Sequence, residues 1–506
     1  MSSPTFPFIE GQGGAITSLV SSSHPEAGIL IVYAAVRKDC SLTIREVGNI
    51  QESATFWSSE NFSGFGDYKF VLISKAASAL DAELLPIASL SLTLTRIDSS
   101  VTIYGEPEHT FSVVLILSTN RSLNCGWNLQ TRRLIVSNWF DVSSPVDVFG
   151  YLAMGQVYDP RPSPLTNRKF ACQQCASAWW KYFDYLHSIT SHKLFSALRT
   201  EMFRSVSRIP LEQLGHGYWT DRNEVHARFH MAGIHMMLSE FCRAGDFFAL
   251  KSAKLHLNYA VSTLWEEMNE GLGWFLHDSE EQDSQTQKIT SSWLGKTPRN
   301  SITLNTHIYA LAAIRRLAEL DPDDAVRNYW IKGYRALKLA LMSQPGQAAY
   351  QLLCLGRQLH RQTKSESLAR WLVRLNSLEK IEWSARAIFP RLVMPDGFIS
   401  RDLTISLRSE KYMIINLKDL LTLYRVHPDE QLESVILRGA QYVRAQDLAK
   451  ALRKSAYFLE WADVLRLLQV CKLQETDVER GAFLNLCRSI RDGEPLDAYS
   501  LQDVRY

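Results

Sequence analysis

Apolar positions follow two different periods along this chain, and the change of period divides it. Up to about residue 150 the period is two, as in Leu90-Ser91-Leu92-Thr93-Leu94-Thr95, which is typical of a strand with one solvated face. Further short apolar runs at 101–104, 111–117 and 134–136 are separated by polar and Gly/Pro turns. Short strands joined in this way predict an antiparallel β-sandwich-like domain.

From about residue 170 the period becomes that of a helix. A proline-rich linker, Asp159-Pro160-Arg161-Pro162-Ser163-Pro164, precedes a predicted pair of helices at 176–186 and 192–206. A phrase of glycine, aromatic and then acidic residue recurs beyond them, at Gly217–Asp221, Gly273–Asp278 and Gly397–Asp402. Each copy precedes a long amphipathic helix, a small-residue turn and a second helix. The turns are Ala244-Gly245-Asp246, Asp321-Pro322-Asp323 and His427-Pro428-Asp429.

A repeated helical hairpin cannot bury its apolar face alone, so its copies must pack on one another. The unequal spacing of the copies favours a closed ring of hairpins, an (α/α) toroid, with the loops gathered at one end. The predicted fold class is therefore α+β and multidomain. We expect a β-rich domain at 1–155, a linker with entry helices at 156–214, and a toroid-like helical domain at 215–506.

Composition narrows the function classes. The 506 residues carry a net charge of only +2, so bulk charge does not favour a nucleic-acid partner. Aromatic residues make up 11%, and aromatic rings in a cleft suit the faces of sugars, although a helical core uses them too. The N-terminus has no secretory pattern and no apolar run is long enough for a membrane helix, so we expect a cytoplasmic location.

Metal-ligand patterns are weak. Cys172 and Cys175 form the one CxxC among eight cysteines, and no second pair lies within zinc-site spacing. His226 and His230 share a helix face but lack the HExxH context. We expect no metal site and no cofactor, and buried thiols on a helix are the preferred interpretation of the cysteine pair.

A resemblance to a known family arises over roughly residues 225–352. Leu304-Asn305-Thr306-His307-Ile308-Tyr309-Ala310-Leu311 resembles the Leu-Asn-Gly-Phe-x-Tyr-Ser/Ala-Leu helix start in the C-terminal helical domain of D-glucuronyl C5-epimerases. Lys332-Gly333-Tyr334-Arg335-Ala336-Leu337 is similar to the next helix of that family, and Asp278-Ser279-Glu280-Glu281 lies where the family has an acidic patch. Tyr350-Gln351-Leu352 departs from the family's Tyr-Asp-Leu motif.

The resemblance implies an isomerase that inverts C5 of uronic acid units in a polysaccharide or oligosaccharide. Such a reaction needs acid/base groups on both faces of the sugar and a cation for its carboxylate. The candidate acid/base residues are Glu280, Glu281, Tyr309 and Tyr350. The candidate substrate-binding residues are Trp219, Arg222, Trp274, His277, Asn305 and Arg401. A solvated acidic loop, a core tyrosine and a helix cap are the structural alternatives for Glu280–Glu281, Tyr309 and Asn305.

Other functions stay open. The acids that close the phrases, Asp221, Asp278 and Asp402, could cap helices or form the carboxyl pair of a glycoside hydrolase or lyase. A non-catalytic glycan-binding or scaffold protein of polysaccharide synthesis would need none of this chemistry, and a homodimer is also left open.

Overall fold

The computed structural model describes residues 6–11, 14–52, 56–59, 62–63, 65–119, 134–137, 140–142, 148–149, 151–159, 169–211, 224–283, 292–362, 377–403, 409–446 and 457–473. These residues form two compact units. The first holds the described residues up to Glu224 together with Ser239–Ala249, and the second holds Val225–Leu238 and the described residues from Leu250 onward. The expected boundaries near 155 and 214 stay predictions.

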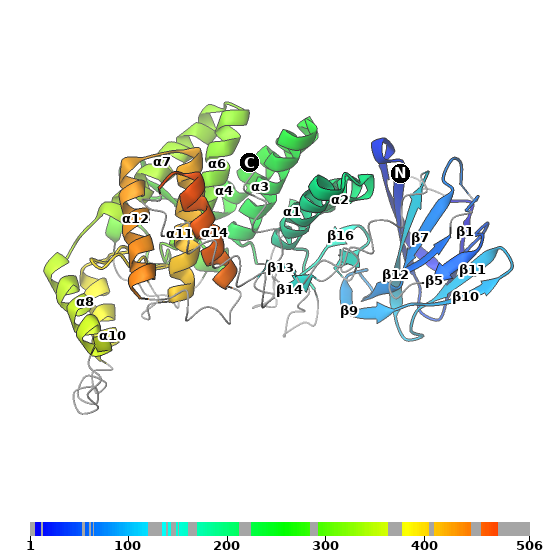
Figure 1. The fold of residues 1–506 in the computed structure, drawn as a ribbon, viewed down its shortest axis with the longest axis horizontal. Coiled ribbons are helices and arrows are strands. Elements are labelled where there is room, and N and C mark those ends of the chain that lie inside the picture. Colours follow the sequence, from blue (N-terminus) through cyan, green and yellow to red (C-terminus); the bar gives the residue numbers. More distant parts are fainter. Residues whose placement is uncertain are drawn as a thin grey trace. The chain divides into compact units, whose positions relative to one another are not determined.

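The first unit begins with two antiparallel sheets (Figure 1). The smaller sheet has the order β1 (Ile9–Gly11), β4 (Ser41–Ile44), β11 (Ser100–Tyr104), β10 (Thr93–Ile97). The larger has the order β2 (Ile16–His24), β3 (Ile29–Val36), β12 (Thr110–Ser118), β7 (Phe70–Ser74), β6 (Phe56–Ser59), β5 (Ile50–Glu52). In addition, β8 (Ala76–Leu80) pairs with β12 and with β9 (Pro86–Ser91).

Both sheets contribute to a single apolar core. Ile44 and Ile103 enter it from the smaller sheet, and Val32, Ile73 and Leu115 enter it from the larger one. At the centre of the larger sheet, β3 and β12 pair in the register Val32↔Leu115, and every residue of β3 is buried. The predicted antiparallel strands are thus confirmed. Their arrangement as a sandwich stays a prediction.

One predicted strand is in fact two. The alternation at 90–95 is present, because Leu90 and Leu92 are buried whereas Ser91 and Thr93 are exposed. However, β9 ends at Ser91 and pairs with β8, whereas β10 begins at Thr93 and pairs with β11 in the other sheet. The amide of Leu92 donates to the Lys75 carbonyl at the crossing. A period of two is insensitive to this change of sheet, because the inward side chains face the same core.

The rest of the first unit connects these sheets to a helical pair. Two small hairpins, β13 (Leu134–Ser137) with β14 (Phe140–Val142) and β15 (Leu152–Ala153) with β16 (Gln156–Val157), precede α1 (Gln173–Thr190) and α2 (Lys193–Ser207). The helices pack along each other, as the sequence predicts. Glu201 of α2 is fully buried, and it accepts hydrogen bonds from Tyr33 Oη at 3.0 Å and Arg208 Nη1 at 2.5 Å. A buried carboxylate with several donors ties α2 to the larger sheet.

The second unit is almost entirely helical. Its helices are α3 (Ala227–Ala244) and α4 (Phe247–Leu264), through which the unit boundary runs, and α6 (Leu304–Leu320), α7 (Asp324–Met342), α8 (Gln347–Gln362), α10 (Ser377–Ile388), α11 (Glu410–Val426), α12 (Glu430–Ala445) and α14 (Tyr457–Val470). A short hairpin of β17 (Trp265–Glu267) and β18 (Gly273–Phe275), followed by the one-turn helix α5 (Glu280–Asp283), lies between α4 and α6. No helix among the described segments is long and apolar enough to span a bilayer.

The predicted hairpin repeat is present in the second unit. Within it α6 packs against α7 and α11 against α12, and the two hairpins pack together through α6 with α11 and α7 with α12 (Figure 1). Asp323 and Asp429, 106 positions apart, cap the second helix of each hairpin by accepting the amides of Ala325 and Gln431. Closure of the hairpins into a ring stays a prediction.

Close helix packing repeats at the same interval. A Cβ added at Gly333 would lie 2.7 Å from Leu311, and one added at Gly439 would lie 2.7 Å from Leu417. Both glycines therefore allow the two helices of a hairpin to approach closely, and the two pairs are again 106 positions apart. The residues that repeat at this interval are thus the glycines at the close helix contacts and the aspartates that cap the second helices.

Candidate active site

The phrases that end at Asp278 and Asp402 meet in the second unit, beside the first residues of α3 and α6. The carbonyl of His277 accepts the amide of Ala227, the first residue of α3, at 3.1 Å. The carbonyl of Arg401 accepts the amide of Leu304, the first residue of α6, at 2.7 Å. Each phrase thus satisfies an otherwise unpaired donor at a helix N-terminus. This shared backbone role places the side chains of His277 and Arg401 next to each other.

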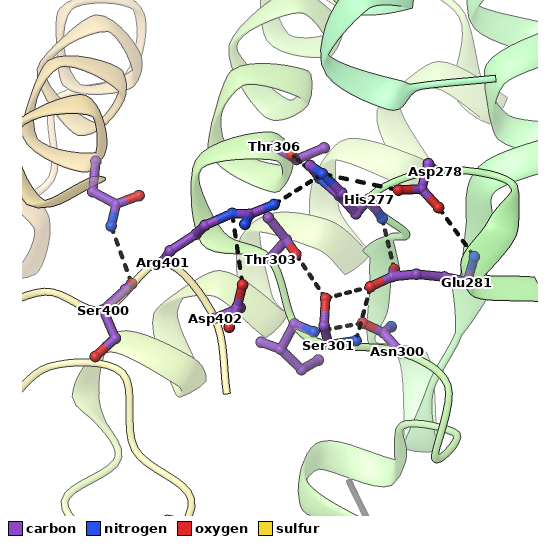
Figure 2. Close-up of polar contacts among 12 residues, drawn as sticks. His277, Asp278, Glu281, Asn300, Ser301, Thr303, Thr306, Ser400, Arg401 and Asp402 are labelled. Atoms are coloured by element: carbon purple, nitrogen blue, oxygen red, sulfur yellow. Dashed lines mark hydrogen bonds and ion pairs between the residues drawn. The ribbon is translucent and has the colours of Figure 1, made fainter. Parts of the chain in front are cut away.

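His277 is a neutral imidazole at the centre of the site. Its Nε2 accepts a hydrogen bond from Arg401 Nη2 at 2.9 Å, since a guanidinium can only donate. The proton therefore lies on Nδ1, which donates to Thr306 Oγ1 at 3.1 Å (Figure 2). Burial, and then the charges of Arg401 and Arg228, lower the pKa of His277 to about 3.

Glu281 lies on the other side of His277 and is 5% exposed. Its Oε2 accepts the amide of His277 at 2.7 Å, and its Oε1 accepts the amide of Ser301 at 3.3 Å and the Ser301 hydroxyl. The Ser301 hydroxyl also lies 2.7 Å from Thr303 Oγ1 (Figure 2). Burial raises the pKa of Glu281 to about 7, even though these donors lower it. The result is a carboxyl group that exchanges its proton near neutral pH.

The phrase-ending acids flank this pair. Asp278 accepts the amide of Glu281 at 3.1 Å, so it caps α5, and burial raises the pKa of its carboxyl group. Its other oxygen lies 3.9 Å from His277 Nε2. Asp402 is 2% exposed and lies 3.6 Å from Arg401 Nε. The guanidinium of Arg401 is centred 4.6 Å from the ring of Tyr412. The two phrases therefore bring two carboxyl groups to one His–Arg bridge.

A second arginine adjoins the bridge. Arg228 forms a bidentate ion pair with Asp419 at 2.6 and 3.1 Å and donates to the carbonyl of Asn305 at 3.1 Å. Its guanidinium is centred 4.5 Å from the ring of Tyr309. The Arg228 charge is also one of the causes of the low pKa of His277, so the site contains two cations beside one neutral imidazole.

The structure brings only some of the sequence-predicted residues together. His277, Glu281 and Arg401 are in direct contact, and Asn305 and Tyr309 join them through Arg228. Glu280 is exposed beside Asp278, whose pKa its charge raises. Trp219 and Arg222 lie outside the described residues.

Trp274 and Tyr350 occupy other surroundings. Trp274 is fully buried and stacks on His307 at a centroid distance of 3.8 Å, whereas His307 Nδ1 accepts the amide of Phe275. Tyr350, in α8, donates its hydroxyl to the carbonyl of Phe389 at 2.9 Å. Both side chains have a structural use where they lie.

Four residues of the candidate site had not been identified from the sequence: Arg228, Ser301, Thr303 and Asp419. Ser301 and Thr303 carry a usable signal, because hydroxyl residues directly before a helix often face its N-terminus. Arg228 and Asp419 carry none, because 191 positions separate the two members of the pair. The two histidines considered as metal ligands diverge: His226 packs edge-on against His277, and the buried His230 packs near Tyr259.

Comparisons with known proteins yield distant likenesses. No family model matches the chain, and no curated protein matches its sequence. Among solved structures, a D-mannose isomerase is similar with a TM-score of 0.37 and 12% identity, over 64% of this chain and 77% of that one. A family 76 glycoside hydrolase from a bovine Bacteroides thetaiotaomicron strain has a TM-score of 0.33 and 10% identity, over 84% and 77%.

The cellobiose 2-epimerase of Bacillus thermoamylovorans is similar with a TM-score of 0.28 and 11% identity, over 53% of this chain and 74% of that one. At these TM-scores neither the family nor the reaction of this chain follows from the likeness.

Proposed function

We propose that this chain is a carbohydrate-active enzyme that inverts C5 of uronic acid units, with its active site around His277. One observation carries the proposal: Arg401 and Glu281 bind the same histidine at different atoms. Arg401 donates to Nε2 of His277, and Glu281 accepts the backbone amide of His277. His277 thereby holds a cation and an acid/base group of pKa about 7 close together, because each of them contacts this one residue. The substrate would be a polysaccharide or oligosaccharide that contains uronic acid.

The chemistry assigns roles to these groups. Removal of the C5 proton creates negative charge beside a carboxylate, and a fixed cation offsets this charge most effectively in a site with little water. Arg401 would bind the carboxylate, since its guanidinium suits bidentate binding. Glu281 would take the proton, and Tyr309 would act on the opposite face of the sugar. Tyr350, in α8, is left out of this set, because its hydroxyl donates to the carbonyl of Phe389, which directly follows α10.

A second candidate function, glycoside hydrolysis, is favoured by a different observation. Asp278 and Asp402 both lie beside the His277–Arg401 bridge, and hydrolysis uses two carboxyl groups on either side of the scissile bond. A lyase or a non-catalytic glycan-binding protein stays open in the same way. The homodimer stays open, and the expected cytoplasmic location stays a prediction.

Proton exchange in D₂O tests the proposal directly. The full chain is incubated with unsulfated hexuronan oligosaccharides, and the C5–H signal is followed by NMR. We expect loss of that signal without chain cleavage. The Glu281→Gln variant should slow the exchange by about 10²–10⁴-fold, as removal of a general acid/base does. Arg401→Gln should slow it by about 10²–10³-fold, and the loss of charge stabilisation should appear in kcat.

Controls separate the alternatives. Glu319→Gln, on the exposed side of α6, removes a carboxylate from the same unit and should leave exchange unchanged. New reducing ends with an intact C5–H signal would replace the proposal with hydrolysis. Binding of the oligosaccharide with neither reaction would support the scaffold alternative.

A further inference from the structure

Three side chains of the kinds that bind metal ions lie close together in the first unit. They belong to a different part of the sequence from the candidate active site. Asp159, Cys172 and Cys175 each offer one ligand atom, and these atoms all lie within 4.8 Å of one another. The three residues are 3–4% exposed. Neither cysteine is in a disulfide in this structure. Among the described residues, this is a cluster of side chains close enough to hold one ion.

Local backbone pairing builds this cluster. The amide of Asp159 donates to the carbonyl of Phe170 at 2.8 Å, and the amide of Cys172 donates to the carbonyl of Val157 at 2.9 Å. The segment that carries Asp159 therefore runs beside the segment that enters α1. Cys172 is the N-cap of α1, and its Sγ accepts the amide of Cys175 at 3.4 Å. The CxxC spacing then places both sulfurs at the first turn of the helix, beside the carboxylate.

A bound metal ion would balance the charge of this cluster. A carboxylate and two thiolates buried together would carry three negative charges, which a protein interior does not tolerate without compensation. A divalent ion supplies two positive charges. The buried Lys169 interacts electrostatically with Asp159, so the segment that carries the aspartate already has a basic side chain beside it.

We propose that Asp159, Cys172 and Cys175 form a zinc-type metal site, with a fourth position for a water molecule or another ligand. Zn²⁺ accepts both sulfur and carboxylate ligands, and tetrahedral coordination at about 2.3 Å places two sulfurs about 3.8 Å apart. The ligand atoms of the cluster all lie within 4.8 Å of one another, which is compatible with this spacing. Binding releases the two thiol protons to solvent, and softer thiolate ligands favour Zn²⁺ over Mg²⁺ or Ca²⁺.

The ion would fasten β16 to the start of α1. Asp159 follows β16 by two residues, and the two cysteines begin α1, so one ion would cross-link two segments that are otherwise joined by a few backbone hydrogen bonds. The proposal departs from the sequence-based expectation that this chain has no metal. That expectation was based on the absence of a second CxxC pair, whereas the fold supplies an aspartate as the third ligand.

The test uses the full chain, purified under reducing conditions, stripped with a chelator and titrated with Zn²⁺ or Co²⁺. We expect one ion per chain, and a thiolate-to-cobalt absorption band that Zn²⁺ abolishes. Cys175→Ser should remove the band, and Asp159→Asn should weaken binding at least tenfold. Cys172→Ser should remove the band while preserving α1, because serine is itself a good N-cap. Cys242→Ser, which removes an exposed thiol of the same unit, is the matched control.

Two results would overturn the proposal. If Zn²⁺ and Co²⁺ leave the folded wild-type chain unchanged, there is no metal site. If the chain isolated without reductant has two fewer alkylatable thiols than the reduced chain and binds no ion when reduced, the pair is a disulfide switch instead. Should a variant fail to fold, the cobalt band of the wild-type chain decides by itself.

Discussion

The hydroxyl of Ser301 should control the acidity of Glu281. It donates to Oε1 of a carboxyl group that is 5% exposed, and its bond is, after burial, the largest influence on the pKa of that group. Ser301→Ala removes this one donor and retains the backbone amides of Ser301 and His277. The carboxylate form loses stabilisation, so the pKa of Glu281 should rise.

The size of the rise follows from the contacts. A hydrogen bond to a charged group contributes about 1.5–3 kcal/mol, and one pKa unit corresponds to about 1.4 kcal/mol. A hydroxyl also binds a protonated carboxyl group, which reduces the difference between the two forms. We therefore expect the lower end of this range, a rise of about 1 unit from the value of about 7 in the wild-type chain.

Two measurements check this shift. Selective ¹³C labelling of glutamate carboxyl groups gives the pKa directly, and the signal that is absent in Glu281→Gln assigns the resonance. The pH dependence of the free energy of unfolding, measured with urea, gives a second estimate of the same pKa shift. Because the folded-state pKa is raised above the ordinary 4.5, the stability it contributes is present below pH 4.5 and is lost as pH rises through 7. The destabilisation of Ser301→Ala should therefore grow by about 1.4 kcal/mol between pH 6 and pH 9.

Ser205→Ala is the matched control, because Ser205 is fully buried and donates to a backbone carbonyl in the first unit. It should destabilise the chain equally at both pH values. A Glu281 pKa that falls, or that does not move, in Ser301→Ala would refute the view that this hydroxyl stabilises the carboxylate.

Three further perturbations have predictable outcomes in urea unfolding. Asp419→Asn leaves the guanidinium of Arg228 without its charge partner and should cost about 3 kcal/mol, whereas the exposed Asp324→Asn should cost almost nothing; equal effects would contradict this reasoning. Gly397→Ala places a Cβ 2.5 Å from a backbone carbonyl at φ +90° and should cost at least about 2 kcal/mol. Acid should destabilise the second unit, because three of its histidines have a folded-state pKa of about 3. As pH falls below 6.5, these histidines take up protons in the unfolded chain but not in the folded one. The free energy of unfolding should therefore fall by about 2 kcal/mol per histidine by pH 5. An unchanged urea midpoint between pH 7 and 5 would contradict this for His256, His277 and His307.

Periodic and capping signals were readable from the sequence because they depend on neighbours in the chain. The helices α6, α7, α11 and α12 and the turns between them follow from apolar spacing and from aspartates that cap the next helix. The capping alternative for Asp278 is confirmed by its bond to the amide of Glu281. Such interactions join residues that are close in the chain, so each of them appears as a short, recognisable sequence pattern.

Contacts between distant segments were not readable. The Arg228–Asp419 pair and the His277–Arg401 contact join residues 191 and 124 positions apart. A single sequence contains no pattern for the Arg228–Asp419 pair, since each residue alone is compatible with a solvated surface. The repeated phrase places His277 and Arg401 at equivalent positions, but it does not specify which copies meet. The same reason explains the division at Leu92, where the strand changes sheet without changing its alternation.

The reactive groups of the candidate site lie where the two copies of the repeated phrase differ in residue type or in loop length. His277 and Arg401 have the same backbone role, since each carbonyl accepts the first amide of a helix, yet one side chain is an imidazole and the other a guanidinium. Two identical cations at these positions would repel each other, and two imidazoles would lack a fixed charge. The loops differ as well: Leu304 follows Asp278 by 26 positions, whereas Glu410 follows Asp402 by 8. Glu281 and Ser301 both lie in the longer loop, so the acid/base group belongs to an insertion that only one of these two copies carries. The hairpins position the site, and the substitution and the insertion give it its reactivity.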